Sequence, residues 1–287
     1  MKKLLILSGK GGTGKTTTAA SFIHFSQARA MADCDVDAPN LHLLSRQTAA
    51  PKVIPFIGSE KASIDPENCI GCGLCQSHCR FNAIQAADGS YAVNEYACEG
   101  CGVCQYVCPQ DAVTLFKDVA GEQTLYTGDR VFSTARLKMG RGNSGKLVSS
   151  VKLAMLKNAP DCDLAVIDGS PGIGCPVIAS ISGVDLVLIV AEPSLSGLSD
   201  LTRLRQSTKT FRVKTAVCVN KWDASPENTE AIEAYCQENG LPFLGRIPYD
   251  PAASAAINQG RSLAETDCPA SRALHHINEQ AMDLLNS

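Results

Sequence analysis

Residues 3–17 read KLLILSGKGGTGKTT, and this stretch decides the fold. The first five residues are almost wholly apolar, which is typical of a short buried strand. The loop after them contains G-x-x-x-x-G-K-[ST], the pattern of a phosphate-binding loop. A helix is predicted from about Thr16 to Gln27. A strand, a glycine-rich loop and a helix in this order indicate an α/β domain that binds phosphate groups.

Strands and helices continue to alternate in the second half of the chain. Apolar runs predict buried strands at 164–167, 186–191, 216–219 and 243–247, and helices are predicted near 146–157, 197–208, 227–238 and 271–285. This alternation predicts a doubly wound, mainly parallel sheet. Residues 124–126 and 130–135 are interpreted as a hairpin over Thr127-Gly128-Asp129.

Eight of the fourteen cysteines form two runs with the identical spacing C-x2-C-x2-C-x3-C. Three thiolates two residues apart can hold three corners of one four-iron cube, and the fourth cysteine of each run ligates the other cube. Cluster I is therefore expected to take Cys69, Cys72, Cys75 and Cys108. Cluster II is expected to take Cys98, Cys101, Cys104 and Cys79. A zinc site is the alternative, but zinc is normally bound by four ligands in two pairs.

The two cysteine runs belong to an internal repeat of 29 residues, the offset between Cys69 and Cys98. Each run ends in a similar segment, although Arg80 stands where the second copy has Pro109. We expect residues 61–117 to form a small bacterial-ferredoxin-like α+β domain carrying two [4Fe-4S] clusters. It would be inserted in a surface loop of a discontinuous domain made of residues 1–60 and 118–287.

The composition excludes several classes of function. The 287 residues are 45% hydrophobic and carry a net charge of −3, which does not suggest a nucleic-acid partner. Residues 61–117 contain three basic and six acidic side chains, so a protein partner would offer a basic docking face. The apolar run at residues 4–7 is too short for a signal peptide, and no run is long enough to span a membrane. We expect a cytoplasmic protein.

The phosphate-binding loop assigns chemistry to its residues. Its backbone N–H groups would bind phosphate oxygens, Lys15 would reach the β and γ phosphates, and the Thr16 hydroxyl would ligate Mg²⁺. The residues expected to bind nucleotide here are Gly9, Gly11, Gly12, Thr13, Gly14, Lys15, Thr16 and Thr17. The alternative is a glycine-rich turn that holds no ligand.

The second lysine of the loop, Lys10, makes GKGGTGKT resemble the deviant Walker A motif of the MinD/ParA/Mrp and nitrogenase iron protein class. The resemblance implies an ATP-dependent homodimer in which Lys10 reaches the nucleotide of the partner subunit. It also implies that Asp35 orients the attacking water. Asp33 and Asp37 are weaker candidates for that role.

Three later segments match the same class. Residues 168–172, DGSPG, resemble its D-x-P-P-G motif, and this implies that Asp168 holds the Mg²⁺ shell. Asn220 ends a strand where the class contacts adenine, although an asparagine there can equally be a strand-end cap. Pro248 and Tyr249 lie in a segment that matches the loop around the base.

Cys175 lies seven residues after Asp168, the offset at which the nitrogenase iron protein carries a bridging cluster ligand. The resemblance suggests that two such cysteines meet metal across a dimer. A buried cysteine beside Pro176 with no ligand is the favoured alternative.

Taken together, the chain resembles MinD-superfamily P-loop ATPases that carry an inserted ferredoxin domain. The resemblance implies hydrolysis of ATP to ADP and phosphate, slow without a partner, coupled to electron transfer through two [4Fe-4S] clusters. An Mrp-type factor that assembles or carries iron–sulfur clusters is the alternative. A spatial organiser like MinD is a third, but no Lys or Arg follows Arg272 in the last helix to hold it on a membrane. The sequence names neither electron donor nor acceptor.

Overall fold

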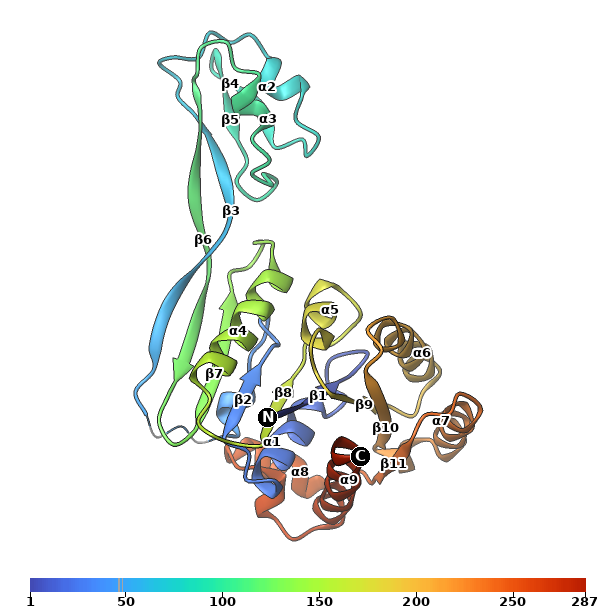
Figure 1. Ribbon diagram of the computed structural model, residues 1–287. Helices are drawn as coiled ribbons and strands as arrows, with labels where there is room; N and C mark the ends of the chain where they lie inside the picture. The colour runs from blue at the N-terminus through green and yellow to red at the C-terminus, as the bar shows by residue number, and fades with distance from the viewer. Residues whose placement is uncertain (46, 48) are drawn as a thin grey trace. The chain divides into compact units, whose positions relative to one another are not determined.

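The computed structural model describes residues 1–45, 47 and 49–287, and the chain divides into two compact units (Figure 1). Unit 1 consists of Met1–Val53, Gln123–Arg136 and Ser144–Ser287. Unit 2 consists of Ile54–Glu122 and Leu137–Asn143, and it holds both cysteine runs. Among the described residues no helix is long and apolar enough to cross a membrane.

A large sheet contains the strands of unit 1 and, in β3 and most of β6, strands that belong to unit 2. Within the described residues it has nine strands in the order β11-β10-β9-β1-β8-β2-β7-β6-β3. The strands are β1 (Lys2–Leu7), β2 (Ala30–Asp33), β3 (Lys52–Ile64), β6 (Val113–Tyr126), β7 (Val131–Leu137), β8 (Leu164–Asp168), β9 (Leu186–Ala191), β10 (Lys214–Asn220) and β11 (Phe243–Ile247). Every neighbouring pair from β11 to β7 is parallel. The predicted doubly wound, mainly parallel sheet is confirmed.

Both faces of this sheet are covered by helices, which explains its continuous apolar strands. Alternate residues such as Leu4 and Ile6 belong to the core that packs on α1 (Lys15–Phe25) and α9 (Pro269–Asn286). Figure 1 shows α8 (Pro251–Asn258) on that same side. The opposite side carries α4 (Ser144–Asn158), α5 (Cys175–Ile181), α6 (Leu195–Thr210) and α7 (Pro226–Glu238).

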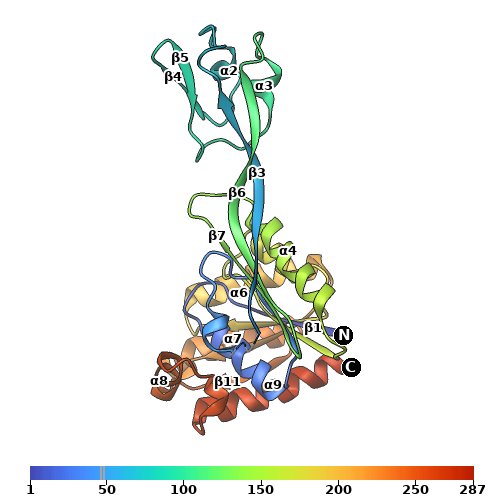
Figure 2. The same ribbon diagram turned by 90° about the vertical axis from the view of Figure 1, so that its left-hand side faces the viewer.

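The chain winds outward from β1 in two directions. β2 lies on one side of β1 and β9 on the other, with β8 between β1 and β2. Ligands of such sheets bind beyond the carboxyl ends of the strands, where the winding reverses. The two chain termini lie close together at the amino ends of the strands, as Figure 2 shows.

The expected hairpin is present, but its first strand is much longer than predicted. β6 ends at Tyr126 and β7 begins at Val131, so the turn falls on residues 127–130. β6 itself begins at Val113. Lys117 and Asp118 interrupt its apolar pattern, which is why the sequence predicted only residues 124–126 as strand.

Unit 2 contains a small hairpin and two single-turn helices. β4 (Ile84–Ala87) pairs antiparallel with β5 (Ser90–Val93) through Asp88 and Gly89, whose φ angles are 40° and 81°. Two positive φ angles are what a two-residue type I′ turn requires. The helices are α2 (Leu74–Ser77) and α3 (Val103–Tyr106), again 29 residues apart. The repeat in the sequence is therefore a repeat in structure.

Candidate functional site

The phosphate-binding loop runs between β1 and α1 at the carboxyl edge of the sheet. α1 begins directly after Gly14, whose φ of 94° lies in the left-handed region. A Cβ atom on Gly14 would lie 2.3 Å from Nδ2 of Asn220, so both backbone and space require glycine. Gly12, with φ 80°, makes the second such turn. These turns allow successive backbone N–H groups of the loop to point toward the same bound anion.

Asp168, at the end of β8, joins the two reactive side chains of α1. Its Oδ1 accepts a hydrogen bond of 2.6 Å from Lys15 Nζ, and its Oδ2 accepts one of 2.6 Å from the Thr16 hydroxyl. Lys15 is 6% exposed and Asp168 is fully buried. Burial alone would lower the pKa of Lys15, but the carboxylates of Asp168 and Asp35 outweigh it and raise that pKa. Lys15 is therefore held as a cation inside the site.

Two aspartates after β2 have different environments. Asp33 is buried, and its carboxylate accepts hydrogen bonds of 3.0 Å from the N–H groups of Asp35, Asn40 and Leu41. Burial, and then the charge of Asp168, raise the pKa of Asp33 to about 7. Asp35 is only partly buried and lies 3.9 Å from Lys15 Nζ. Asp33 thus shapes the loop, while Asp35 presents a carboxylate to the phosphate site.

The loops after β2 and β8 are bonded directly to each other. The N–H of Cys34 donates to the carbonyl of Asp168 at 2.8 Å, and the Ser170 hydroxyl donates to the carbonyl of Cys34. A movement of one loop must therefore disturb the other. The sequence motifs gave no indication of this link, because backbone partners leave no residue pattern.

Lys10 has different partners from Lys15. Its Nζ lies 2.5 Å from the carboxylate of Glu192 and 3.2 Å from the Ser196 hydroxyl, just beyond β9. Both charged side chains are well exposed, at 42% and 38%. Lys10 is consequently accessible to a second molecule, and Glu192 is a partner that the sequence motifs did not identify.

A pocket beside the loop collects the residues expected around the base. It is lined by Gly12, Gly14, Thr17, Asn220, Lys221, Pro248 and Tyr249, among others. Asn220 is fixed from both ends, because its Nδ2 donates to the Thr13 carbonyl at 2.8 Å and its Oδ1 accepts from the Lys221 N–H at 3.0 Å. Asp223, which was not predicted, accepts a bond of 2.8 Å from the Tyr249 N–H. Segments far apart in sequence thus form one wall.

Four cysteines of unit 2 line one cavity, in the combination expected for cluster I. This small cavity is lined by Cys69, Cys72, Cys75 and Cys108, together with apolar residues such as Ile64 and Val113. Cys98, Cys79, Cys104 and Cys108 belong to one apolar cluster that also contains Ala62 and Ala83. Three cysteines of one run and the last cysteine of the other therefore share this cavity.

Backbone N–H groups are directed at several of these sulfur atoms. Ala83 donates to Cys79 Sγ at 3.4 Å, and Ala112, at the matching position of the repeat, donates to Cys108 Sγ at 3.3 Å. Such bonds favour the thiolate form and are typical of the surroundings of iron–sulfur clusters. Burial, however, raises the pKa of the Cys75 thiol.

Across the described ranges, no three or more His, Cys, Asp or Glu side chains are arranged to hold one metal ion. A four-iron cube spreads its ligands over four separate iron atoms, so its cysteines stand farther apart than the ligands of a single zinc ion. Four cysteines that line one cavity match the number of ligands that a four-iron cube requires, one for each iron atom. Cys175 is exposed at the start of α5, so the expectation of a buried cysteine is wrong. It lies beside Gly145 of α4, outside these groups.

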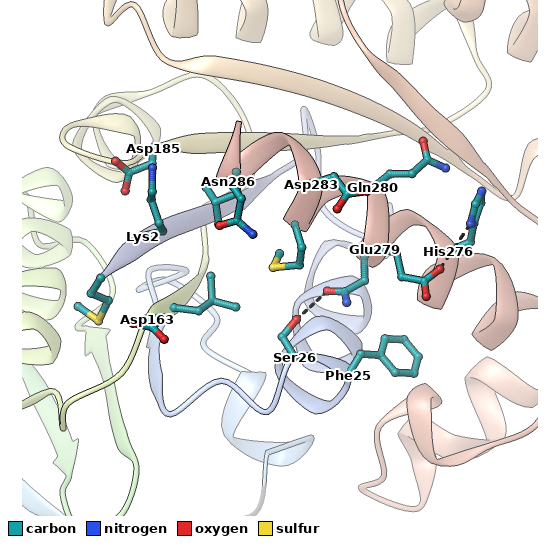
Figure 3. A pocket seen from close by; sticks show the side chains of 15 residues that line it. Lys2, Phe25, Ser26, Asp163, Asp185, His276, Glu279, Gln280, Asp283 and Asn286 are labelled. Atoms are coloured by element: carbon teal, nitrogen blue, oxygen red, sulfur yellow. Dashed lines mark hydrogen bonds and ion pairs between the residues drawn. The ribbon is translucent and has the colours of Figure 1, made fainter.

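An open groove lies at the opposite, amino edge of the sheet. It is formed by the start of β1, Ser26 after α1 and the last turns of α9 (Figure 3). The Ser26 hydroxyl donates to Asn278 at 2.9 Å, while Asp163, Asp185 and Asp283 line the rim. None of the predicted site residues lies in this groove.

Residues 4–263 match the family model described as "CobQ/CobB/MinD/ParA nucleotide binding domain". The chain belongs to this family. It is 36% identical, over 224 residues, to an uncharacterized protein of Methanocaldococcus jannaschii, which covers 76% of this chain and 78% of that relative. The expected membership in the MinD/ParA class of P-loop ATPases is confirmed.

Two further relatives describe the range of the family. The iron-sulfur cluster carrier protein of Pyrococcus horikoshii is 23% identical, with 99% of this chain and 86% of that protein covered. The septum site-determining protein MinD complexed with Mg-ADP, from Pyrococcus horikoshii OT3, superimposes with a TM-score of 0.59. It shares 16% identity and covers 97% of this chain and 95% of its own, so it shows the common fold.

Proposed function

We propose that the protein hydrolyses ATP as a nucleotide-dependent homodimer and transfers electrons through two [4Fe-4S] clusters held in unit 2. The observation that carries the ATPase is the convergence of Lys15, Thr16 and Asp168 at the carboxyl edge of the sheet, with bonds of 2.6 Å. The neighbouring pocket of Asn220, Pro248 and Tyr249 would take the adenine base.

Charge exchange at Asp168 would accompany ATP binding. Lys15 leaves the Asp168 carboxylate and binds the β- and γ-phosphate oxygens. The phosphate thus replaces the carboxylate as the anionic partner of the ammonium. The Thr16 hydroxyl and Asp168 then hold the Mg²⁺ shell, and their present 2.6 Å contact fits two ligands of one small cation. Mg²⁺, when bound, supplies charge neutralisation on the transferring phosphoryl group. Asp35 orients the water for in-line attack.

Dimer formation would move Lys10. The Glu192 carboxylate gives up the Lys10 ammonium, which reaches the phosphates in the partner subunit and completes the charge stabilisation there. An exposed ion pair contributes about 0 to 1 kcal/mol, so this exchange costs little.

In unit 2 the eight predicted thiolates hold the clusters, with N–H groups of Ala83 and Ala112 on two of the sulfur atoms. When bound, each cluster supplies one-electron redox chemistry. The acidic side chains of residues 61–117 favour a redox partner with a basic docking face.

The decisive experiment measures ATPase rate and dimer fraction under anaerobic conditions, with the clusters first oxidised and then reduced by dithionite. We expect about eight iron atoms per chain and a change in at least one of the two quantities on reduction. Lys15→Gln serves as the hydrolysis-deficient control. Equal rates and equal dimer fractions in both redox states would refute the coupling.

A second candidate function is that of a cluster carrier, and the relative named as an iron-sulfur cluster carrier favours it. Transfer of iron to an apo-acceptor in the presence of a chelator separates the two functions. Clusters that survive the chelator and cycle reversibly support electron transfer. Clusters that leave for the acceptor in an ATP-dependent manner support the carrier.

A further inference from the structure

The internal repeat makes the two cysteine centres directly comparable. The Asp65 N–H donates to the Ala112 carbonyl at 2.8 Å, and Asn94, 29 residues later, donates to Ala83 at 2.7 Å. The two halves therefore exchange equivalent hydrogen bonds. Each position around one centre has a counterpart around the other.

The repeat pairs the end of β3 with β5. A Cβ on Gly71 would lie 3.1 Å from the Gly89 carbonyl oxygen, and one on Gly100 would lie 1.9 Å from that of Glu60. Each glycine lets its cysteine loop approach the equivalent backbone closely. The residue after Gly89 therefore corresponds to the residue after Glu60.

Backbone contacts agree with this pairing. The Ala62 N–H donates to Cys98 Sγ at 3.5 Å, and the Tyr91 N–H bonds the Cys69 thiol. The N–H groups of Gly71 and Tyr91 and the Ser90 hydroxyl together lower the pKa of Cys69. The surroundings of the two leading cysteines are thus alike in their main-chain donors.

They differ at one buried side chain. Lys61 is only 5% exposed, and its ammonium donates to the carbonyl of Cys98. Its counterpart is Ser90, a neutral hydroxyl. One centre therefore has a buried positive charge at its first cysteine, and the other has none.

Most other charged differences between the halves are solvent-exposed. Asp118, whose counterpart is Gly89, is buried, but its carboxylate is paired with Arg141 at 3.2 Å. Glu99 follows Cys98, and Arg80 follows Cys79, where the other centre has Ile70 and Pro109. Glu99 and Arg80 have opposite signs and are both exposed, so water and salt screen them. A buried charge is screened much less.

We propose that Lys61 makes the cluster held by Cys98, Cys101, Cys104 and Cys79 the one with the higher reduction potential. The inference rests on the proposed function, because it requires both clusters to be bound. Reduction adds one electron to a cluster, and a nearby buried cation stabilises the added negative charge. An electron that enters at the cluster of Cys69, Cys72, Cys75 and Cys108 would first reduce that cluster. Its transfer to the other cluster would then re-oxidise the first cluster and reduce the second by one electron.

The test is an anaerobic redox titration followed by electron paramagnetic resonance, on protein loaded with about eight iron atoms. Wild type should show two one-electron steps. Lys61→Gln should lower the midpoint potential of the higher step by about 59 mV, which corresponds to about a tenfold change in the equilibrium constant of a one-electron reduction. The midpoint potential of the lower step should stay nearly unchanged. Lys61→Arg should retain the wild-type value. Lys117→Gln, which removes an exposed lysine of unit 2, should shift neither step.

The outcomes separate the inference from the proposed function. Wild-type protein that binds no iron on reconstitution would refute both. Eight bound irons with both steps unmoved in Lys61→Gln, or with only the lower step moved, would refute the role of Lys61 alone. If the Lys61→Gln variant loses its iron, NMR spectra of half-reduced wild-type protein test which cluster has the higher reduction potential. The paramagnetically shifted β-proton signals of Cys98, Cys101 and Cys104 should show that the cluster they hold is reduced first. Earlier reduction of the cluster held by Cys69 would overturn the proposal.

Discussion

Asp168 contacts both polar side chains of α1 that are expected to bind phosphate and Mg²⁺. It neutralises Lys15 with one oxygen and binds the Thr16 hydroxyl with the other, each at 2.6 Å. The buried ammonium is thus paired before any nucleotide arrives, which avoids the large cost of an isolated buried charge. The Walker pattern in the sequence predicts which residues take part, but it does not predict this internal pairing.

Lys10 and Glu192 provide the first prediction at this scale. Lys10→Ala should retain nucleotide binding and lose ATP-dependent dimerisation, because the proposed contact in trans is removed. Glu192→Gln should raise the dimer association constant by up to about 30-fold, the equivalent of about 1 kcal/mol for each of the two exposed ion pairs that a symmetric dimer gives up. Sedimentation velocity with ATP measures both effects. Lys209→Ala, at an exposed lysine of α6, is the matched control, and a Lys10→Ala dimer of normal affinity would contradict the assignment.

Asp33 provides a prediction on pH. The folded protein holds its proton up to a pKa of about 7, whereas the unfolded chain releases it near 3.8. Between these values the folded state binds more protons, so the free energy of unfolding falls as pH rises from about 4 to about 7. Denaturant titrations without nucleotide at pH 5 and pH 8 measure this difference.

Asp33→Asn should reduce that pH dependence, since the amide does not titrate. Asp37→Asn changes an exposed carboxylate of the same loop and should leave the pH dependence as in wild type. Identical differences between pH 5 and pH 8 in all three proteins would count against the buried carboxyl.

At the scale of elements, the phosphate-binding loop depends on Gly14. Gly14→Ala places an alanine at φ 94° and pushes a Cβ to 2.3 Å from Asn220 Nδ2, which breaks its bond to Thr13. The left-handed backbone alone costs about 1 to 2 kcal/mol, so the free energy of unfolding should fall by at least that amount. Gly11→Ala is the control, because it has open space around it and no positive φ. Equal stability of the two variants would contradict this account.

Long elements with a clear period could be predicted from the sequence, and short or irregular ones could not. The strands at 186–191 and 243–247 have the predicted bounds. The first is a continuous apolar run, and the second begins and ends with apolar residues and is followed by Pro248. α5 has seven residues and α8 has eight, too few to show a helical period.

The loop Leu137–Asn143 shows what local patterns miss. Arg141 pairs with Glu95 at 3.0 Å and with Asp118 at 3.2 Å, which includes this loop in unit 2 although 61–117 was the expected domain. An ion pair between residues 46 apart leaves no periodic trace in the sequence. The same limitation applies to Lys61 and Cys98, which meet only through the fold.

At the scale of the whole molecule, the crossed ligand sets give a further prediction. Cys108→Ser should remove or destabilise the cluster of Cys69, Cys72 and Cys75, because all four cysteines line one cavity. We expect iron content to fall towards about four atoms per chain, with the Lys61-dependent redox step retained. Iron analysis and the redox titration check both points. Loss of the Lys61-dependent step with retention of the other would show that the ligand sets are not crossed.

The family and the main fold could be predicted from the sequence because the Walker motif and the strand–helix alternation are local. The roles of Asp35, Asp168 and the eight cysteines stay predictions, although the structure places both aspartates beside Lys15 and four of the cysteines around one cavity. What the sequence could not supply is the partner of each charged group. Glu192 beside Lys10 and Ser170 beside Cys34 are separated by more than a hundred residues, so only the folded chain identifies them.

The 29-residue repeat also bears on how unit 2 can evolve. Each half contributes a wall to the cavity or cluster that belongs mainly to the other half, as Cys108 does for the first run. Deletion of either half would consequently leave neither centre complete. A duplicated segment built in this way can be gained or lost only as a pair, while its two copies remain free to diverge at single positions such as Lys61 and Ser90.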